Sequence, residues 1–90
     1  MSDLGIRAEL DRYLTHKHRN EQTGAEMVFY FHVYEGDLAM DVAVSADDAY
    51  FYRARGRRTV RETAEWMAKE IAGRAFTAHR EKWAQPREEL

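Results

Sequence analysis

Residues 27–34 alternate between an apolar face and a more polar face, and this is the most regular pattern in the chain. The apolar face comprises Met27, Phe29, Phe31 and Val33, and the other face comprises Val28, Tyr30, His32 and Tyr34. Alternation with a period of two predicts a strand that buries one of its faces. The sequence Glu35-Gly36 then predicts a two-residue hairpin turn, because glycine adopts the positive φ that tight hairpins need. A turn centred there pairs residues whose numbers add to 71, so that Phe31 faces Met40 and Phe29 faces Val42. Apolar residues then meet apolar partners across the hairpin, and this match fixes the expected register.

The segments on either side of this hairpin predict a first helix and a third strand. Ile6, Leu10 and Leu14 recur at helical spacing, which predicts a helix from the N-terminus to about residue 18. Residues 46–48 are typical of a second turn. Residues 49–55 predict a third strand beside the hairpin, with Arg53 facing outward opposite Asp41.

A second helix is predicted from residue 60 to residue 83 or 84. The sequence Thr59-Val60-Arg61-Glu62 fits a capping box, in which a hydroxyl and a carboxylate satisfy backbone donors at a helix start. Trp66 falls opposite the apolar stripe of this helix. The stripe comprises Val60, Ala64, Met67, Ala68, Ile71, Ala72, Ala75 and His79. We therefore expect an α+β fold of order α-β-β-β-α, a three-stranded antiparallel meander with two helices on one face.

Composition is that of an ordinary single domain. The chain has 90 residues, of which 44% are hydrophobic and 33% charged, and it contains no cysteine. We expect one domain over residues 1–90 with a polar tail from about residue 85. No apolar run is long enough for a membrane span, and the first residues lack the regions of a signal peptide. Together these features favour a cytoplasmic protein without disulfides and without a membrane partner.

The residues that usually support catalysis or metal binding lack the spacing that such sites require. His16 and His18 are two positions apart, so a helix directs them away from each other. Neither Ser2 nor Ser45 lies in a nucleophile elbow, and no glycine-rich phosphate loop is present. We therefore expect a protein that is not an enzyme and that has no cofactor and no metal site.

The net charge of −2 conceals a segregation of charge along the chain. Residues 26–50 contain six acids and no lysine or arginine, whereas residues 51–61 contain five arginines and no acid. The acids are Glu26, Glu35, Asp37, Asp41, Asp47 and Asp48, and the arginines are Arg53, Arg55, Arg57, Arg58 and Arg61. Either the two blocks pair with each other within one sheet, or they form two surfaces for different partners.

The arginine block is a candidate phosphate site. Arg57, Arg58 and Arg61 lie in or beside the first turn of the last predicted helix, where free backbone N–H groups favour anions. Arg53 and Arg55 on the outward face of the third strand extend it. The predicted order of elements and the Arg-Arg-x-x-Arg spacing resemble the double-stranded RNA-binding domain. This resemblance implies that the arginines contact the phosphates of a nucleic-acid duplex.

The acidic block points to a different partner. We expect its carboxylates and nearby aromatic residues to dock on a basic protein surface or to imitate a nucleic-acid backbone. This candidate surface comprises Glu35, Asp37, Asp41, Asp47, Asp48, Tyr30, Tyr34 and Trp66. Size and charge pattern are similar to those of small phage inhibitors such as anti-CRISPR proteins. The leading hypothesis is therefore a small non-enzymatic binding protein that acts by occupying the surface of a macromolecular partner. The alternatives are duplex nucleic-acid binding and a homodimer formed by helices or sheet edges.

Overall fold

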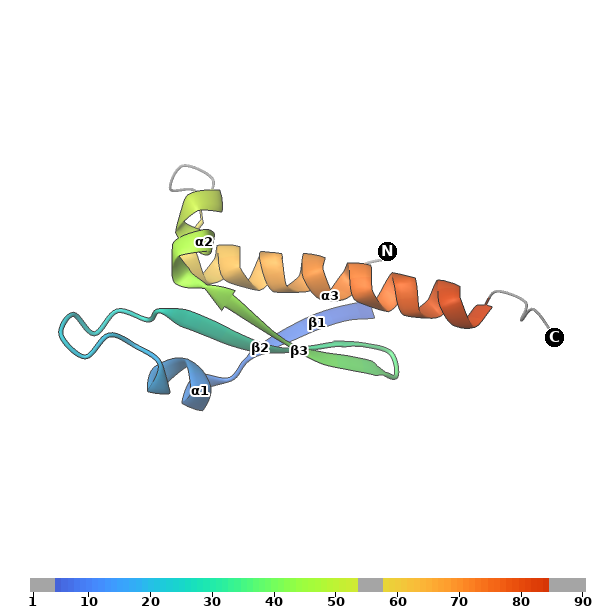
Figure 1. Cartoon of the computed structure of the whole chain (residues 1–90), viewed down its shortest axis with the longest axis horizontal. Helices are drawn as coiled ribbons and strands as arrows, with labels where there is room; N and C mark the ends of the chain where they lie inside the picture. Colours follow the sequence, from blue (N-terminus) through green and yellow to red (C-terminus); the bar gives the residue numbers. More distant parts are fainter. Residues whose placement is uncertain (1–4, 54–57, 85–90) are drawn as a thin grey trace.

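The computed structural model describes residues 5–53 and 58–84, which form an antiparallel sheet and accompanying helices (Figure 1). The elements are β1 (Ile6–Leu10), α1 (Arg12–Lys17), β2 (Val28–Glu35), β3 (Leu38–Ser45), α2 (Ala46–Tyr52) and α3 (Val60–Ala84). The strands lie in the order β1-β2-β3 and both neighbouring pairs are antiparallel. The expected α+β class and three-stranded antiparallel sheet are confirmed, but two segments form elements other than those predicted.

The hairpin of β2 and β3 keeps its predicted faces but not its predicted register. Paired residues add to 73 rather than 71, so that Phe31 faces Val42 and Phe29 faces Val44. The turn therefore consists of Gly36 and Asp37, and Gly36 has a φ of +62°. A slip of two residues leaves every side chain on its original face, because side chains in a strand alternate with a period of two. The buried face is thus as predicted, whereas each cross-strand partner is different.

The first segment begins with a strand, where the spacing of apolar residues predicted a helix. Ile6 and Leu10 are four positions apart, and this separation fits one face of a helix and one face of a strand equally well. The alternating half-buried and exposed positions of β1 show that the strand period applies. Asp11 ends the strand and caps α1, since its Oδ1 accepts the N–H of Leu14 at 2.9 Å. The helix of this segment is therefore only six residues long.

The predicted third strand at residues 49–55 is wrong, because residues 46–52 form α2. Ser45 is the N-cap of α2, and its Oγ accepts the N–H groups of Asp47 at 3.1 Å and Asp48 at 3.5 Å. The two aspartates in the first turn suit the positive end of the helix dipole, so they start a helix and not a turn. Ala49 is the buried residue of α2. Because residue 53 is the C-cap of α2, Arg53 does not face Asp41 across a sheet.

Helix α3 begins and ends where the sequence predicts. Its capping box is formed as expected, with Thr59 N–H donating to Glu62 Oε1 and Glu62 N–H donating to Thr59 Oγ1, both at 3.0 Å. Ala64, Ala68 and Ala72 of the expected stripe are fully buried. Ile71 and Ala75 of the same stripe are exposed, and Phe76 is buried instead. The contact is therefore a narrow seam of residues spaced by four, in which small side chains let the helix lie close to the sheet.

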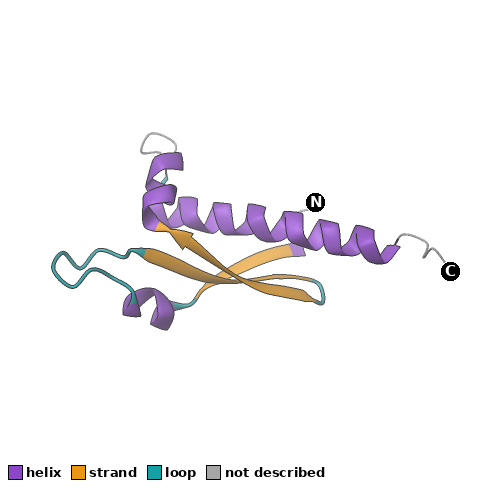
Figure 2. Cartoon of the chain, in the orientation of Figure 1, coloured by secondary structure: helices purple, strands orange, loops and turns teal. Residues whose placement is uncertain are grey.

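The core lies between α3 and one face of the sheet (Figure 2). Phe29, Phe31, Val33, Val42 and Val44 contribute from β2 and β3. Figure 1 shows α3 along this face, α1 on the opposite side of the sheet, and α2 upright at the end of β3. The sheet thus has one covered face and one largely open face. The predicted tail from residue 85 lies outside the described residues.

Of the helices that the structure describes, none combines the length and apolar character needed to cross a bilayer.

Candidate functional site

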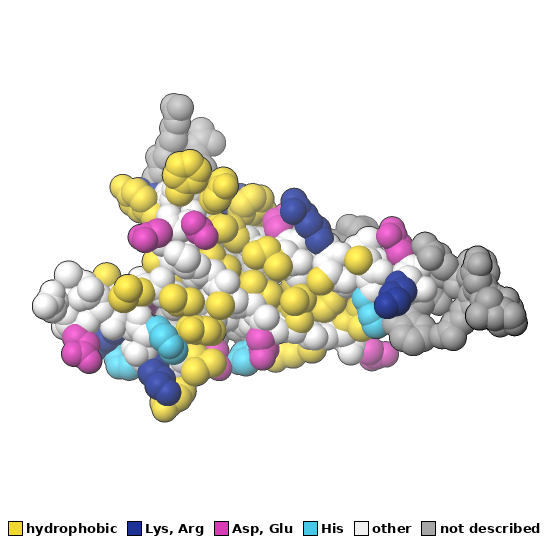
Figure 3. All heavy atoms as spheres, viewed as in Figure 1, with side chains coloured by type: hydrophobic (Ala, Val, Ile, Leu, Met, Phe, Trp, Pro, Cys, Tyr) yellow, Lys and Arg dark blue, Asp and Glu magenta, His cyan; other side chains and the backbone are white. Residues whose placement is uncertain are grey.

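Three consecutive aromatic side chains of α2 are largely exposed to solvent. Tyr50, Phe51 and Tyr52 are consecutive and are between 60% and 77% exposed. They remain outside because α2 has only two turns and anchors itself through the fully buried Ala49. The rings of Phe51 and Tyr52 meet edge to face with centroids 5.0 Å apart. Figure 3 shows hydrophobic side chains gathered over this helix.

Arg53 extends this surface with a positive charge. Its guanidinium carbon lies 4.7 Å from the centre of the Tyr50 ring, which is the geometry of a cation–π contact. The described residues give Arg53 no carboxylate partner. We call Tyr50, Phe51, Tyr52 and Arg53 the α2 aromatic surface. Aromatic residues and arginine are the residue types enriched where proteins bind each other.

Trp66 lies on α3 with its ring partly exposed, as the sequence predicted from its place opposite the apolar stripe. The guanidinium carbon of Arg58 lies 5.6 Å from its ring centre. Lys69 lines the same hollow and forms an ion pair with Glu65 at 3.6 Å. The surroundings of Trp66 are thus mixed in charge and not uniformly acidic or basic.

The carboxylates of the predicted acidic surface lie at separate places on the fold. Glu35 is at the end of β2 and accepts a hydrogen bond from Arg80 of α3 at 3.1 Å. Asp37 is exposed in the hairpin turn. Asp41 lies in β3, whereas Asp47 and Asp48 lie in the first turn of α2. The block that is continuous in the sequence is therefore divided among the turn, the open sheet face and a helix start.

The arginines are likewise divided. Arg58 lies over Trp66, while Arg61 lines a shallow hollow with Glu26 and Asp47. Arg55 and Arg57 lie outside the described residues. The order α-β-β-β-α that supported the resemblance to the double-stranded RNA-binding domain is not the order of this fold, so only the arginine spacing supports it.

The open face of the sheet contains a histidine held between two carboxylates. His32 Nδ1 lies 2.7 Å from Asp41 Oδ1, and His32 Nε2 lies 2.9 Å from Asp11 Oδ2. The observed register creates this cluster, since it places His32 directly opposite Asp41. Tyr30 and Tyr34 lie on the same face by strand alternation, and the Tyr30 ring packs on His18 with centroids 5.1 Å apart.

The two carboxylates favour the charged form of His32. Hydrogen bonds to Asp41 and then to Asp11 raise its pKa above the ordinary histidine value. The pKa of Asp11 is lowered, first because its carboxylate accepts the Leu14 N–H and then because it binds His32. Both ring nitrogens are engaged, which leaves none for a metal ion. Elsewhere too, the part of the chain that the structure describes contains no group of three or more acidic or histidine side chains that could hold a metal.

Sequence reasoning gives no role to His32 or Asp11. The alternation of β2 does place His32 on the polar face, but the expected register puts Ala39 and not Asp41 across from it. The sequence predicts that Asp11 lies inside a helix. It therefore does not predict that Asp11 lies at the end of β1, within reach of His32.

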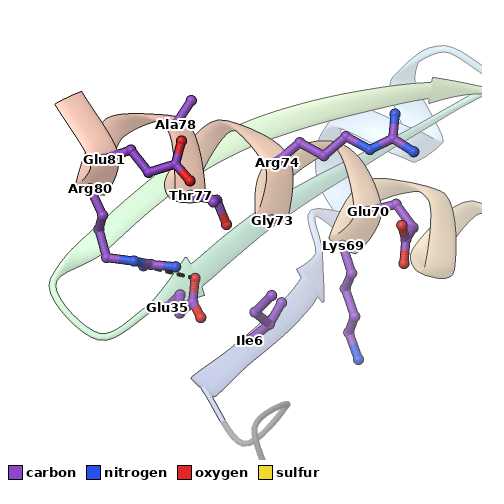
Figure 4. Close-up of a pocket in the computed structure, with 10 residues that line it drawn as sticks. All are labelled: Ile6, Glu35, Lys69, Glu70, Gly73, Arg74, Thr77, Ala78, Arg80 and Glu81. Atoms are coloured by element: carbon purple, nitrogen blue, oxygen red, sulfur yellow. Dashed lines mark hydrogen bonds and ion pairs between the residues drawn. The ribbon is translucent and has the colours of Figure 1, made fainter.

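A groove of about 430 Å³ lies between the start of β1 and α3 (Figure 4). Ile6 points from β1 toward Gly73, where a Cβ would lie 3.4 Å from Ile6 Cδ1. The Arg80–Glu35 pair closes one end of the groove, and Lys69 and Arg74 extend from the helix above it. The groove is shallow and mixed in charge, so it does not enclose a small molecule.

Comparison of the chain with protein-family models, with curated proteins and with solved structures gives no significant match.

Proposed function

We propose that this chain is a small binding protein, without catalytic activity of its own, that acts by occupying the surface of a protein partner through the α2 aromatic surface. The observation that supports this proposal is the exposure of Tyr50, Phe51 and Tyr52 on one short helix. Apolar area kept in water is unfavourable, and a contiguous patch of it usually marks an interaction site. Small phage inhibitors, which the chain resembles in size and charge pattern, act by occupying a partner in this way.

The charges at this end of the molecule indicate the character of the partner. Arg53 and Arg58 each lie over an aromatic ring and have no carboxylate partner among the described residues. A protein surface with an apolar hollow bordered by carboxylates complements this arrangement in both shape and charge. We therefore expect a partner surface that is apolar at its centre and that has carboxylates where it meets Arg53 and Arg58.

A nucleic-acid partner is less favoured by the same geometry. Asp47 and Asp48 occupy the first turn of α2, and Glu62 occupies the N-terminus of α3 by capping Thr59. These carboxylates repel a phosphate backbone at the two helix starts where backbone N–H groups could bind it. We therefore do not propose duplex binding through Arg58 and Arg61, and the crosslinking experiment is designed so that it would detect such binding.

Site-specific photo-crosslinking tests the proposal. A photoreactive phenylalanine analogue is placed at position 51 in one protein and, as the matched control, at exposed Ile71 on α3 in a second protein. Both are irradiated in cells that naturally express the chain. We expect a discrete adduct from position 51, absent from position 71, that protease degrades and nuclease leaves intact.

Affinity measurements on two variants then show which side chains contribute to binding. Phe51→Ala is expected to weaken binding of the purified crosslinked partner by about tenfold or more, as truncation of a central aromatic contact usually does. Asp37→Asn is expected to leave the affinity unchanged. The proposal is wrong if no adduct forms at position 51. A nuclease-sensitive adduct that is lost on Arg58→Ala and at high salt identifies the arginine alternative instead.

A further inference from the structure

The outer edge of β1 is unpaired in the described part of the fold, and its backbone groups are available. The N–H of Asp11 donates to the carbonyl of Tyr30 in β2 at 2.7 Å, which fixes the direction of the odd-numbered backbone groups. In an antiparallel ladder alternate residues direct their N–H and C=O to opposite sides. Ile6, Ala8 and Leu10 therefore direct theirs away from β2. Such an edge is a template for another strand.

The side chains of β1 are symmetric in character about Ala8. Arg7 and Glu9 flank it on the open face, and Ile6 and Leu10 lie at the two ends on the covered face. In an antiparallel pair of two β1 strands centred on Ala8, Arg7 of each copy faces Glu9 of the other. Ile6 of each copy then faces Leu10 of the other. Neither Arg7 nor Glu9 has an ion-pair partner among the described residues of one copy.

We propose that β1 is a self-complementary edge through which two copies of this chain pair, antiparallel and centred on Ala8. The pair joins two three-stranded sheets into one sheet of six strands, with a twofold axis midway between the two Ala8 residues. Opposite charges directly across an antiparallel pair stabilise it, and symmetry supplies the Arg7–Glu9 pair twice. A peptide of unrelated sequence lacks this match, so a second copy is the occupant that the edge fits.

The flank of α3 above this edge faces the same second copy. Lys69 lines the groove beside Ile6 (Figure 4) and also the hollow that contains Trp66, so the two hollows adjoin each other at Lys69 of α3. A joined sheet brings the two α3 helices next to each other along these flanks.

Charge reversal tests this pairing by sedimentation equilibrium over a concentration series of the full chain. The unaltered chain is expected to approach twice the monomer mass. Arg7→Glu places two carboxylates opposite each other and Glu9→Arg places two guanidinium groups opposite each other, so each variant is expected to weaken dimerisation by about tenfold or more. In an equimolar mixture, the heterodimer of the two variants has an opposite-charge pair on both sides of Ala8, so the mixture is expected to dimerise where each variant alone does not. The double variant restores both pairs within a homodimer, with their signs exchanged. The double variant is therefore expected to recover the homodimer.

Ala8→Pro provides a test of the backbone contribution. The N–H that proline lacks is one directed away from β2, so the intrachain sheet keeps its hydrogen bonds while the proposed pair loses two. We expect a native circular dichroism spectrum and a monomeric mass. The proposal is overturned if the unaltered chain stays monomeric throughout, or if the single reversals dimerise as the unaltered chain does. Because Phe51 is not part of this edge, loss of the dimer and loss of partner binding are separate results.

Discussion

At the scale of single residues, two polar side chains join the N-terminal segment to the sheet. Asp11 caps α1 and also binds His32 of β2, which in turn binds Asp41 of β3. Thr15 of α1 is buried, and its Oγ1 accepts the N–H of Tyr30 at 3.0 Å. Since α1 is only six residues long and offers little apolar area, these polar contacts fix its position on the sheet.

Replacing Thr15 by Val is expected to destabilise the protein by about 1–3 kcal/mol, because it leaves the partly buried N–H of Tyr30 without an acceptor. Thr63→Val is the matched control at an equally buried threonine. The Thr63 hydroxyl donates to the carbonyl of Thr59, and that carbonyl also accepts the Thr63 N–H, so it keeps a partner. Urea unfolding measures both variants, and equal losses of stability would contradict this account.

The charge on His32 makes the stability dependent on pH. Because the pKa of His32 is raised by folding, its contribution is fully present below the ordinary value of about 6.5 and is lost as pH rises through the folded value. The lowered pKa of Asp11 has the opposite effect, since its contribution is lost as pH falls below about 3.9. Glu9, across from His32 in the β1–β2 register, adds a further negative charge nearby.

We therefore expect the difference in unfolding free energy between the unaltered chain and His32→Gln to shrink between pH 6 and pH 9. The change amounts to about 1 kcal/mol or less, because solvent screens an exposed cluster. Urea unfolding at a series of pH values gives this difference directly. A difference that is constant across the range would show that His32 acts by shape alone.

At the scale of elements, the sequence predicts secondary structure best where the apolar positions fit only the helical period or only the strand period. The eight-residue alternation of β2 and the long stripe of α3 each fit a single period, and both elements are confirmed. Ile6 and Leu10 are compatible with both periods, and the pattern of residues 49–55 does not exclude the helix that Ser45 caps. The elements predicted for these two segments are therefore wrong.

The candidate sites show the same limit. The exposure of Trp66 follows from the helical period alone and was predicted correctly. The α2 aromatic surface depends on the helix that Ser45 caps, and the His32 cluster depends on a register two residues from the expected one. Helix caps and strand register depend on several hydrogen bonds that form together. The pattern of apolar positions in the sequence does not predict these hydrogen bonds.

The packing of α3 on the sheet depends on small residues along one seam. We expect Ala68→Leu to destabilise the protein by about 1–3 kcal/mol, because the added side chain forces α3 away from β2 and β3. Ala75→Leu adds the same atoms at an exposed position of the same helix and is expected to change the stability little. Thermal unfolding of the two variants distinguishes this seam from the broader stripe that the sequence predicted.

At the scale of the whole molecule, α3 is longer than the sheet that it covers. A helix of 25 residues spans about 37 Å, whereas a strand of eight residues spans about 26 Å. The last turns of α3 therefore extend past the core, where Arg80 binds Glu35 (Figure 1). The Cα radius of gyration of 15.8 Å exceeds the value of about 12 Å for a compact chain of this length. The buried core is small as a result.

Two phenylalanines distinguish the residues that stabilise the fold from those of the proposed contact surface. A domain of 90 residues has a total stability of about 5–13 kcal/mol, and truncating a fully buried phenylalanine costs about 3–5 kcal/mol. Phe31→Ala is therefore expected to remove a large share of the stability, while Phe51→Ala, at a side chain that is mostly in water, changes it by less than about 0.5 kcal/mol. Urea unfolding compares the two variants. A large loss of stability in Phe51→Ala would mean that α2 belongs to the core, and the exposed aromatic side chains would then serve the fold and not a partner.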